Sequence, residues 1–553
     1  MSPTPDAPSR AEPVWWRGAV LYQVYLRSYA DGDGDGLGDL KGLIARLDHI
    51  ADLGVDGLWL GPFYPTPDRD FGYDVSDYRA VDPRFGTLDD FDMLLREAHA
   101  RGLKVIIDQV WSHTSAEHAW FQDSRSTREH AKADWYVWAD ARPDGSPPNN
   151  WQSWMGGPAW RWEPRRGQYH LHNFLPTMPD LNLHHPEVQA AILDIADFWL
   201  ARGVDGFRLD TANLYFHDRQ LRDNPALPPE RRGASPVLMQ AHQYNADQPE
   251  TLPFLEALRA RMDAYGERMA VGEIGGAAWD ARMAEYTEGD RRLHTAYSFA
   301  FLGPRPSPRE IAERLQAWTT RSGWPSWAFS NHDVPRVATR WSADQARAFD
   351  FGLGGGDAGA TGVIPPQTWM ALLMALRGTV FVYQGEELGL EEAQVPFEQM
   401  KDPFGLAHWP LVTGRDGCRT PMPWTADAAH AGFSPVEPWL PVWPAHRALA
   451  VDRQSQDEAS MLATTRQLIG LRRSHAALRV GELDVARVDD ELLHLVRRDH
   501  TSTLHAVFNL GSTSRALPMP DAEPRTLWTF GARPGAHSLH VPPGSAWYGL
   551  GDL

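Results

Sequence analysis

The 553-residue sequence has only one cysteine, Cys418. A single cysteine excludes an intrachain disulfide bond and any zinc site that needs several cysteines. It also fits a reducing compartment, so we expect a cytoplasmic protein. The sequence has no run of about 18 apolar residues, and we therefore expect no membrane helix and no membrane partner. Residues 1–13 are rich in Pro, Ala and Ser, which indicates a disordered tail rather than a signal peptide.

Positive charge is also scarce, because 53 Lys and Arg residues stand against 72 Asp and Glu residues, a net charge of −19. Such an acidic surface repels phosphate backbones, so we expect no nucleic-acid partner. Tryptophan, in contrast, is abundant, with 24 residues. An indole ring offers a broad apolar face and one N–H donor, which suits carbohydrate binding, although filling a large core is its more ordinary use.

Helix, glycine stop and short apolar strand follow one another repeatedly along the chain. Apolar residues recur at helical spacing over 39–53, Gly54 stops the helix, and residues 55–60 form a short apolar strand. This order is typical of a parallel sheet covered by helices. Eight strand candidates lie at residues 21–27, 55–60, 104–110, 204–209, 269–274, 296–301, 326–330 and 380–383. Eight strands predict a closed (β/α)8 TIM barrel, with an open doubly wound sheet as the alternative.

Two parts of the chain depart from this pattern. Residues 111–182 are rich in Trp, Pro, Gly and Asn, which predicts a loop-rich domain inserted after the third strand. From residue 478 onward, short alternating segments such as 492–496 and 504–508 predict a C-terminal antiparallel β-sandwich over 478–553. The catalytic barrel would then comprise residues 14–110 and 183–477.

Carboxylates follow several of the predicted strands, among them Asp108, Asp210, Glu273 and Asp333. The active site of a barrel of this type forms at the carboxyl ends of its strands, where unpaired carboxylates would repel one another. Arg208 and Asp210 are two residues apart on a strand and therefore share a face, so the guanidinium would keep Asp210 ionised. Glu273 lies on the neighbouring strand and could serve as a proton donor. Two carboxyls about 5–5.5 Å apart have the geometry of retaining glycoside hydrolysis. A buried Arg–Asp ion pair is the structural alternative.

Five short motifs occur in a fixed order along these strand ends. They are Asp-Gln-Val-Trp-Ser-His at 108–113, Pro-Asp-Leu-Asn at 179–182, Gly-Phe-Arg-Leu-Asp at 206–210, Gly-Glu at 272–273 and Ser-Asn-His-Asp at 330–333. In this order the motifs resemble those of glycoside hydrolase family 13, the α-amylase family, and its α-glucosidase branch in particular. The resemblance covers nearly the whole chain and implies the barrel, the inserted domain and the C-terminal β-domain.

The resemblance also implies a role for each motif residue. Asp210 would attack the anomeric carbon as the nucleophile, and Glu273 would act as the acid and then the base. Asp333 would hold the sugar hydroxyls and stabilise the transition state. His113 and His332 would donate hydrogen bonds to the same sugar. A metal-ligand role for the two histidines is disfavoured, because no His-x-x-x-His or similar spacing accompanies them.

A second set of residues would bind the substrate, again by resemblance. Tyr73, in the segment Asp-Phe-Gly-Tyr at 70–73, would stack on the glucose, and Asp70 would bind its non-reducing edge. Arg419 would be the partner of Asp70 and would close the pocket behind one glucose unit. A closed pocket implies exo action on short substrates. Phe174 would line the pocket entrance, with a core position as the alternative.

The residues after the nucleophile bear on linkage. Thr211 and Ala212 follow Asp210, and in this branch Thr or Ala there accompanies α-1,4 cleavage, whereas Val accompanies α-1,6 cleavage. We therefore expect an α-1,4-directed α-glucosidase that also transfers glucose to alcohols. A sucrose-directed hydrolase or glucosyltransferase and an oligo-1,6-glucosidase are the alternatives. One departure from the family pattern is Ser112, which stands where many relatives have Asn.

A glycine-rich acidic segment at 31–39 follows the first strand. Alternating carboxylates and glycine turns can wrap a hard cation through oxygen atoms. By resemblance the segment binds one structural Ca²⁺ or Mg²⁺ ion, with a solvated acidic loop as the alternative. The expected ligands are Asp31, Asp33, Asp35, the Leu37 carbonyl and Asp39. No organic cofactor is expected; the partner would be a small carbohydrate substrate, and the protein would be a monomer or a homodimer.

Overall fold

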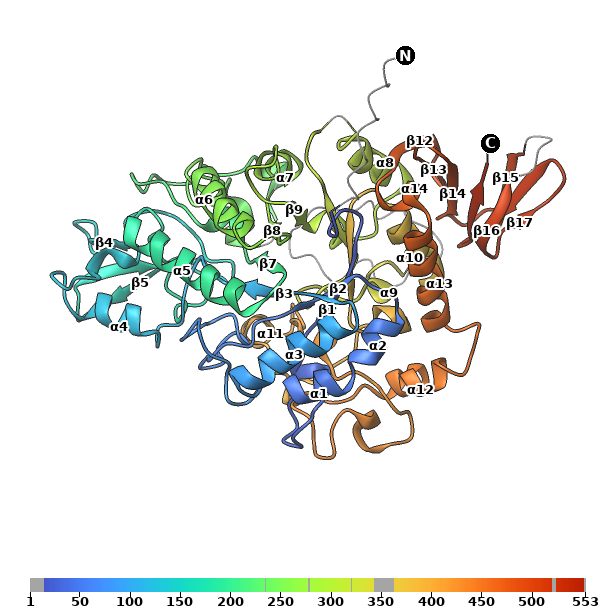
Figure 1. Ribbon diagram of the computed structural model, residues 1–553. Helices are drawn as coiled ribbons and strands as arrows, with labels where there is room; N and C mark the ends of the chain where they lie inside the picture. Colours follow the sequence, from blue (N-terminus) through green and yellow to red (C-terminus); the bar gives the residue numbers. More distant parts are fainter. Residues whose placement is uncertain are drawn as a thin grey trace, which may run out of the picture.

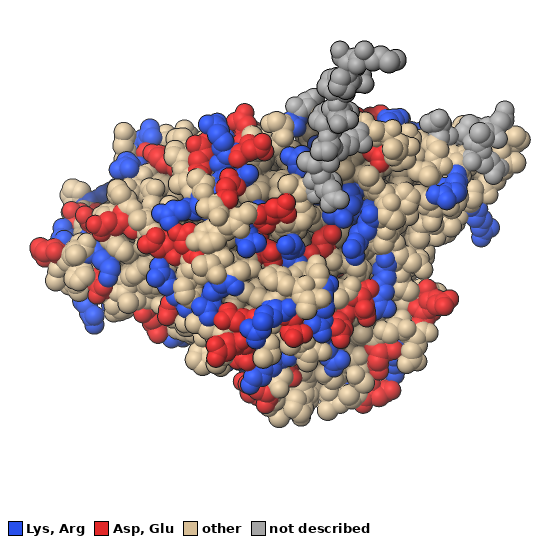
Figure 2. All heavy atoms as spheres, in the orientation of Figure 1, with Lys and Arg blue, Asp and Glu red and all other residues tan. Residues whose placement is uncertain are grey.

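The computed structural model describes residues 14–233, 235–276, 279–319, 321–342, 363–519 and 524–551 (Figure 1). The tail predicted for residues 1–13 lies outside the described residues. Within the described part of the chain, no helix is long and apolar enough to cross a membrane. On the face drawn in Figure 2, acidic and basic side chains alternate rather than gather by sign.

Eight parallel strands form a closed barrel, as the sequence predicts. They are β1 (Val20–Val24), β2 (Gly57–Leu60), β3 (Lys104–Gln109), β7 (Gly206–Leu209), β8 (Met269–Ile274), β9 (Thr295–Ser298), β10 (Ser326–Ala328) and β11 (Thr379–Tyr383). Their order in the sheet is β10-β11-β1-β2-β3-β7-β8-β9. A parallel bridge between Ala296 and Pro325 joins the two ends of the sheet, so the open-sheet alternative is wrong. The strands are apolar and buried on both sides because helices cover the outer face.

Helices follow most of these strands and cover the barrel (Figure 1). They are α1 (Leu40–Ala45), α2 (Leu47–Asp52), α3 (Leu88–Ala100), α5 (Pro186–Arg202), α6 (Thr251–Asp263), α7 (Trp279–Tyr286), α8 (Pro308–Gln316), α9 (Val337–Arg340), α10 (Pro366–Ala375), α11 (Pro403–His408), α12 (Val451–Gln454), α13 (Met461–Ser474) and α14 (Ala476–Arg479). Local sequence sets their ends. Thr87 and Asp90 form a capping box at the start of α3, and Gly203 ends α5 in the left-handed conformation.

The segment between β3 and α5 forms a separate lobe, on the left in Figure 1. It contains α4 (Ala119–Ser126) and a three-stranded antiparallel sheet of β4 (Trp138–Ala139), β6 (Gln168–Leu171) and β5 (Trp160–Glu163). Its small core includes Trp151 and Trp160, whose ring centroids lie 6.0 Å apart. These elements fall within residues 111–182, but the exact domain bounds stay a prediction.

The C-terminal part consists of antiparallel strands, on the right in Figure 1. One sheet contains β12 (Glu482–Val488), β13 (Leu492–Arg498), β14 (Thr503–Asn509), β19 (Ala546–Leu550) and β16 (Arg525–Phe530). A second contains β15 (Arg515–Pro518), β18 (Ser538–Val541) and β17 (Arg533–Pro534). A shared apolar cluster that includes Val507, Leu539 and Trp547 joins the sheets. Buried Arg497 donates to the carbonyl of Ala375 at 2.7 Å and so ties this part to α10.

Candidate active site

The carboxyl ends of β3, β7 and β8 lie side by side and bring the predicted catalytic groups together. Asp108 of β3 is in register with Arg208 of β7, and Leu209 is in register with Gly272 of β8. Asp210 follows Leu209, and Glu273 follows Gly272. Parallel register therefore places Asp210 and Glu273 beside each other at the mouth of the barrel, where barrel enzymes bind their substrates.

The guanidinium of Arg208 joins the carboxylates of this cluster. Its Nη1 lies 2.8 Å from Asp108 Oδ1 and 2.6 Å from Asp210 Oδ1, and its Nη2 lies 2.6 Å from Glu273 Oε1. Arg208 has no exposed surface. Because Asp210 and Glu273 contact two nitrogens of the same guanidinium, their carboxyls lie close together at the mouth of the barrel. Two neighbouring carboxyls are what retaining glycoside hydrolysis uses.

Burial and charge determine the protonation of the pair. Burial raises the pKa of Glu273 to about 7, although Arg208 opposes the rise. Burial likewise raises the pKa of Asp210, and the same guanidinium lowers it. With Asp108 also present, one guanidinium contacts more carboxylates than it can neutralise, so the coupled pair retains a proton near neutral pH. A proton on Glu273 and a charge on Asp210 form the state that acid-assisted nucleophilic attack requires.

Two aromatic rings stack with His332. The Tyr73 ring centroid lies 5.3 Å from that of His332, and the Tyr25 ring centroid lies 5.7 Å from it. Burial lowers the pKa of His332 to about 3, so the ring is neutral. Its Nδ1 accepts a hydrogen bond from the Gln23 amide at 2.7 Å, and Nε2 therefore carries the proton. That Nε2 lies 2.6 Å from the Tyr73 hydroxyl and 3.2 Å from Asp333 Oδ2.

The predicted pairing of Asp70 with Arg419 is wrong. Asp70 Oδ1 lies 2.6 Å from Nη2 of Arg415, four residues earlier in the chain. Arg419 instead donates through Nε to the His332 carbonyl at 2.6 Å and through Nη2 to Asp333 at 2.9 Å. Burial alone would raise the pKa of Asp333, but His332, Arg419 and Arg415 hold it below its ordinary value. Arg419 thus contacts Asp333 rather than the far edge of the pocket.

The remaining predicted substrate residues border the same cluster. His113 Nε2 donates to the Tyr73 carbonyl at 3.0 Å, and burial lowers the pKa of His113 to about 4. The half-buried Phe174 ring lies 5.2 Å from the His113 ring. Thr211 directly contacts both carboxylates, because its N–H donates to Glu273 and its hydroxyl donates to Asp210. The structure therefore brings the predicted residues together around one site, while their individual roles stay predictions.

Four further residues, Asp108, Tyr297, Asp402 and Arg415, belong to this site but were not among the predicted site residues. Asp108 and Tyr297 complete the contacts of Arg208. Asp402 is fully buried, and its carboxylate accepts hydrogen bonds from the Arg415 backbone N–H at 2.7 Å and from Arg415 Nη2 at 2.8 Å. The sequence signal for Asp108 was its position at a strand end. Tyr297 and Asp402 carry no local signal, because their contacts cross from other parts of the chain.

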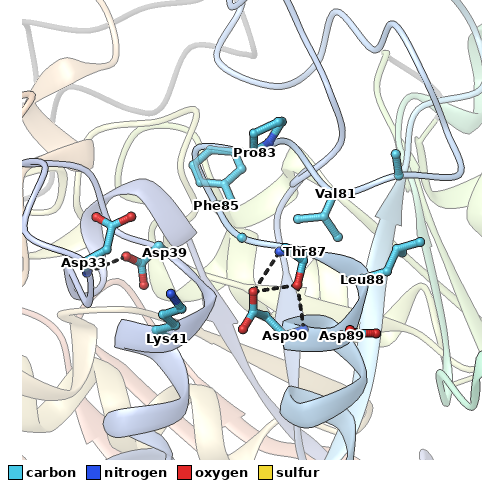
Figure 3. Close-up of a pocket in the computed structure, with 12 residues that line it drawn as sticks. Asp33, Asp39, Lys41, Val81, Pro83, Phe85, Thr87, Leu88, Asp89 and Asp90 are labelled. Carbon is cyan, nitrogen blue, oxygen red and sulfur yellow. Dashed lines mark hydrogen bonds between the residues drawn. The ribbon is translucent and has the colours of Figure 1, made fainter.

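The acidic loop after β1 brings together part of the predicted metal set. Carboxylate oxygens of Asp31, Asp33 and Asp39 all lie within 4.8 Å of one another. Asp35 lies outside that group; its exposed carboxylate accepts the Leu37 N–H at 2.8 Å. Among the described residues, no Lys or Arg forms an ion pair with these three carboxylates. Figure 3 shows the hydrogen bond that the Asp33 backbone N–H donates to the Asp39 carboxylate. An uncompensated cluster of oxygen ligands fits a hard cation.

Comparison with known proteins assigns the family. The model of the alpha-amylase catalytic domain matches residues 23–481. The probable alpha-glucosidase of Rhizobium meliloti (strain 1021) is 49% identical over 546 residues, which are 97% of this chain and 96% of that protein. The oligo-1,6-glucosidase of Heyndrickxia coagulans is 33% identical over 579 residues, covering 97% of this chain and 99% of that protein.

Solved structures of similar proteins support the same family assignment. The alpha-glucosyl transfer enzyme XgtA is 49% identical, with a TM-score of 0.91 over 98% of this chain and 100% of that chain. A mutant of the MutB trehalulose synthase in complex with sucrose is 30% identical, with a TM-score of 0.85 over 99% of this chain and 100% of that chain. The family match spans most of the sequence and includes every strand of the barrel except the start of β1. The chain therefore belongs to the alpha-amylase family and is a glycoside hydrolase.

Proposed function

We propose that the protein is an exo-acting, retaining α-glucosidase that releases terminal α-D-glucose from α-1,4-linked disaccharides and short oligosaccharides. The observation that carries the proposal is the contact of Asp210 and Glu273 with the same Arg208 guanidinium, at 2.6 Å each. This shared contact supports a site in which one protonated and one charged carboxyl lie beside the same sugar carbon. Double displacement needs such a pair.

The reaction has two chemical steps. In the first, Glu273 gives its proton to the glycosidic oxygen, the bond to the anomeric carbon breaks, and an oxygen of Asp210 bonds to that carbon. In the second, Glu273 takes a proton from water, the hydroxide oxygen attacks the anomeric carbon, and Asp210 leaves as a carboxylate. Two inversions restore the α configuration. Asp333 would bind sugar hydroxyls and stabilise the positive charge of the transition state.

Exo action is supported by the ion pairs of Arg415 with Asp70 and Asp333. Arg415 contacts Asp70 at 2.6 Å and Asp333 at 3.3 Å, so one arginine connects the predicted far edge of the glucose to the catalytic aspartates. Arg415, Asp70 and Asp333 come from three separate loops. Together they would bind the terminal hydroxyls of one glucose unit and leave no passage for a longer chain on that side.

Linkage and acceptor are the finer parts of the proposal. Thr211 supports α-1,4 cleavage by the family pattern, while the likeness to an oligo-1,6-glucosidase keeps α-1,6 cleavage as the alternative. The likeness to a sucrose-bound trehalulose synthase favours sucrose as a second substrate. The likeness to an alpha-glucosyl transfer enzyme favours transfer of glucose to an acceptor in place of water, and we propose alcohols as that acceptor. The glucosyl ester on Asp210 serves both outcomes.

Product analysis tests the proposal. Maltose, isomaltose, sucrose and trehalose are supplied separately to the purified protein, and the anomeric proton of released glucose is followed by NMR during the first minutes. We expect maltose to be cleaved fastest. The configuration of the product is read from an aryl α-glucoside, whose only sugar is the transferred glucose, and α-glucose should form first. Initial release of β-glucose from that substrate would refute the retaining mechanism, and isomaltose as the preferred disaccharide would refute the α-1,4 preference.

We also propose that Asp31, Asp33 and Asp39 hold one structural Ca²⁺ or Mg²⁺ ion. The ion would neutralise the charge of the loop and fix it against the start of α1, where the Asp39 side chain accepts the Gly42 N–H at 2.6 Å. The proposed setting is the cytoplasm, which the lone buried Cys418 suits. A monomer or homodimer in that setting would be distinguished by light scattering.

A further inference from the structure

Thr211 has an unusual backbone conformation next to the proposed nucleophile. Its φ is 40° and its ψ is 47°, in the left-handed region that β-branched residues seldom adopt. Such a conformation persists where surrounding contacts favour it, and it is most often found at functional sites. Here it directs the N–H to Glu273 Oε2 at 3.1 Å while the hydroxyl lies 3.2 Å from Asp210 Oδ2.

The direction of the hydrogen bonds around Ser112 follows from its neighbours. A carbonyl only accepts, so His113 Nε2 must carry the proton that it donates to the Tyr73 carbonyl. Because burial keeps this histidine neutral, its Nδ1 has no proton and can only accept. The Ser112 hydroxyl lies 2.8 Å from that Nδ1 and therefore donates to it. Ser112 Oγ then offers only lone pairs to its other neighbour.

That other neighbour is the Thr211 hydroxyl, 3.2 Å from Ser112 Oγ. Thr211 has one hydroxyl proton and two acceptors at the same distance, Ser112 Oγ and Asp210 Oδ2. A charged carboxylate is the stronger acceptor. When Asp210 carries the glucosyl group as an ester, its negative charge is gone and Ser112 competes for the proton.

We propose that Ser112 and Thr211 form a hydroxyl pair in which the Thr211 proton goes to Asp210 and stabilises its charge whenever the glucosyl ester is absent, and goes to Ser112 when the ester is present. The inference rests on the proposed function, since it assigns the nucleophile to Asp210. Thr211 is the residue in contact with Asp210, and Ser112 is the competing acceptor for its proton. The pair makes Asp210 a better leaving carboxylate in the second chemical step, because the hydrogen bond to Thr211 is regained as the ester breaks.

Other groups also act on Asp210 and must stay the same in a test. The positively charged group near Asp210 is Arg208. Carboxylates and tyrosine hydroxyls from several elements also act on Asp210: Asp108, Glu273, Asp333, Tyr73, Tyr78 and Tyr215. Substitution of uncharged hydroxyl residues alters none of these groups, so a change in the titration of Asp210 reports the hydroxyl pair.

The experiment is an NMR titration of the full-length protein labelled with ¹³C at the aspartate carboxyls, with Asp210→Asn used to assign the Asp210 signal. Thr211→Val keeps the β-branched shape but removes the donor, and we expect it to raise the pKa of Asp210 by about one. Thr211→Ser keeps a hydroxyl and should restore the native pKa. Ser112→Ala leaves Asp210 as the acceptor for Thr211, so the pKa should fall or stay at the native value.

Thr114→Val is the matched control, because the Thr114 hydroxyl contacts Tyr136 at 2.7 Å rather than Asp210. It should leave the Asp210 titration unchanged. An Asp210 pKa that stays within about 0.2 of the native value in Thr211→Val, or that rises in Ser112→Ala, would overturn the proposal.

Activity provides a second readout. The acidic limb of kcat/KM for an aryl α-glucoside should move to higher pH in Thr211→Val and return in Thr211→Ser, because a higher pKa means that Asp210 ionises at higher pH. If the native protein cleaves no glucoside, the proposed function fails, whereas the NMR titration still decides the role of the hydroxyl pair.

Discussion

At the scale of single residues, the site depends on a few buried arginines that are shared between carboxylates. Arg208 contacts Asp108, Asp210 and Glu273, and Arg415 contacts Asp70, Asp333 and Asp402. A buried carboxylate without a partner is costly, so each arginine both orients its neighbours and keeps them charged. Removing one partner is therefore expected to affect every carboxylate of its group.

Replacement of Asp210 by Asn removes the nucleophilic oxygen anion while keeping the shape of the side chain. We expect kcat for maltose to fall by about 10⁴-fold or more, because the first covalent step is lost. Asp140→Asn is the control, since Asp140 is exposed in the inserted lobe. Steady-state kinetics measure both variants, and more than a tenth of native activity in Asp210→Asn would contradict the assignment.

Replacement of Arg415 by Lys keeps the charge but removes the fork that reaches Asp70 and Asp333 together. We expect kcat/KM for maltose to fall by about 100-fold, because a lysine cannot make both contacts in the same geometry. Arg453→Lys, at a half-exposed surface pair with Asp427, should change kcat/KM by less than about twofold. Equal losses in the two variants would mean that Arg415 has no special place in the pocket.

At the scale of elements, the position at which a strand ends determines where the loop with the functional residues begins. The strand predicted for residues 21–27 ends at Val24, and a 3-10 helix follows over Leu26–Ser28. This early end lets the chain turn into the acidic loop that precedes α1. The loop is stabilised by its own carboxylates, because the Asp39 side chain accepts the N–H groups of Gly32 and Asp33 at 3.0 Å. The loop would be fixed further by a cation.

Addition of Ca²⁺ at about 100 times its Kd should raise the unfolding temperature of the native protein by about 2 °C, since binding at that excess contributes about 2.7 kcal/mol. Asp31→Asn should lose most of this rise, because a ligand of the proposed site is neutralised. Asp35→Asn should keep it, because Asp35 lies outside the converging group. Calorimetry with and without chelator gives the comparison; equal responses in the two variants would argue against the site.

At the scale of the whole molecule, the barrel buries the catalytic pair while the inserted lobe and the loop after β11 surround it. Loop 153–157 of the lobe lies against His408 of α11. A β-carbon added at Gly156 would be only 3.1 Å from His408 Nε2. Ser153 of the same loop donates to the Phe174 carbonyl at 2.7 Å. The lobe, the loop and the barrel therefore enclose one site, and burial there sets the protonation of the pair.

The pH dependence of kcat/KM should be bell-shaped. Glu273 must hold a proton to act as the acid, and burial raises its pKa to about 7, so activity on maltose should fall as pH rises above about 7. Asp210 must be ionised, so activity should also fall in acid. An α-glucosyl fluoride needs no proton donor for its leaving group, and its alkaline limb should flatten. Identical alkaline limbs for the two substrates would contradict the role of Glu273.

Much of this protein could be predicted from local patterns. The alternation of apolar strands and amphipathic helices predicted the barrel, because side-chain periodicity along an element reports which face is buried. The short motifs at the strand ends located Asp210, Glu273 and Asp333, because parallel strands deliver their carboxyl ends to one edge. Spacing of two between Arg208 and Asp210 was enough to predict their ion pair, since alternate residues of a strand share a face.

Contacts between distant segments were decided only by the tertiary structure. Arg415 and Arg419 are alike in sequence, and which of them meets Asp70 depends on how the loop held by Asp402 packs. Asp35 has the same spacing as its neighbours, but its carboxylate does not converge with theirs. Local sequence determines the shape of each element, whereas hydrogen-bond partners across the chain depend on the final packing of all of them.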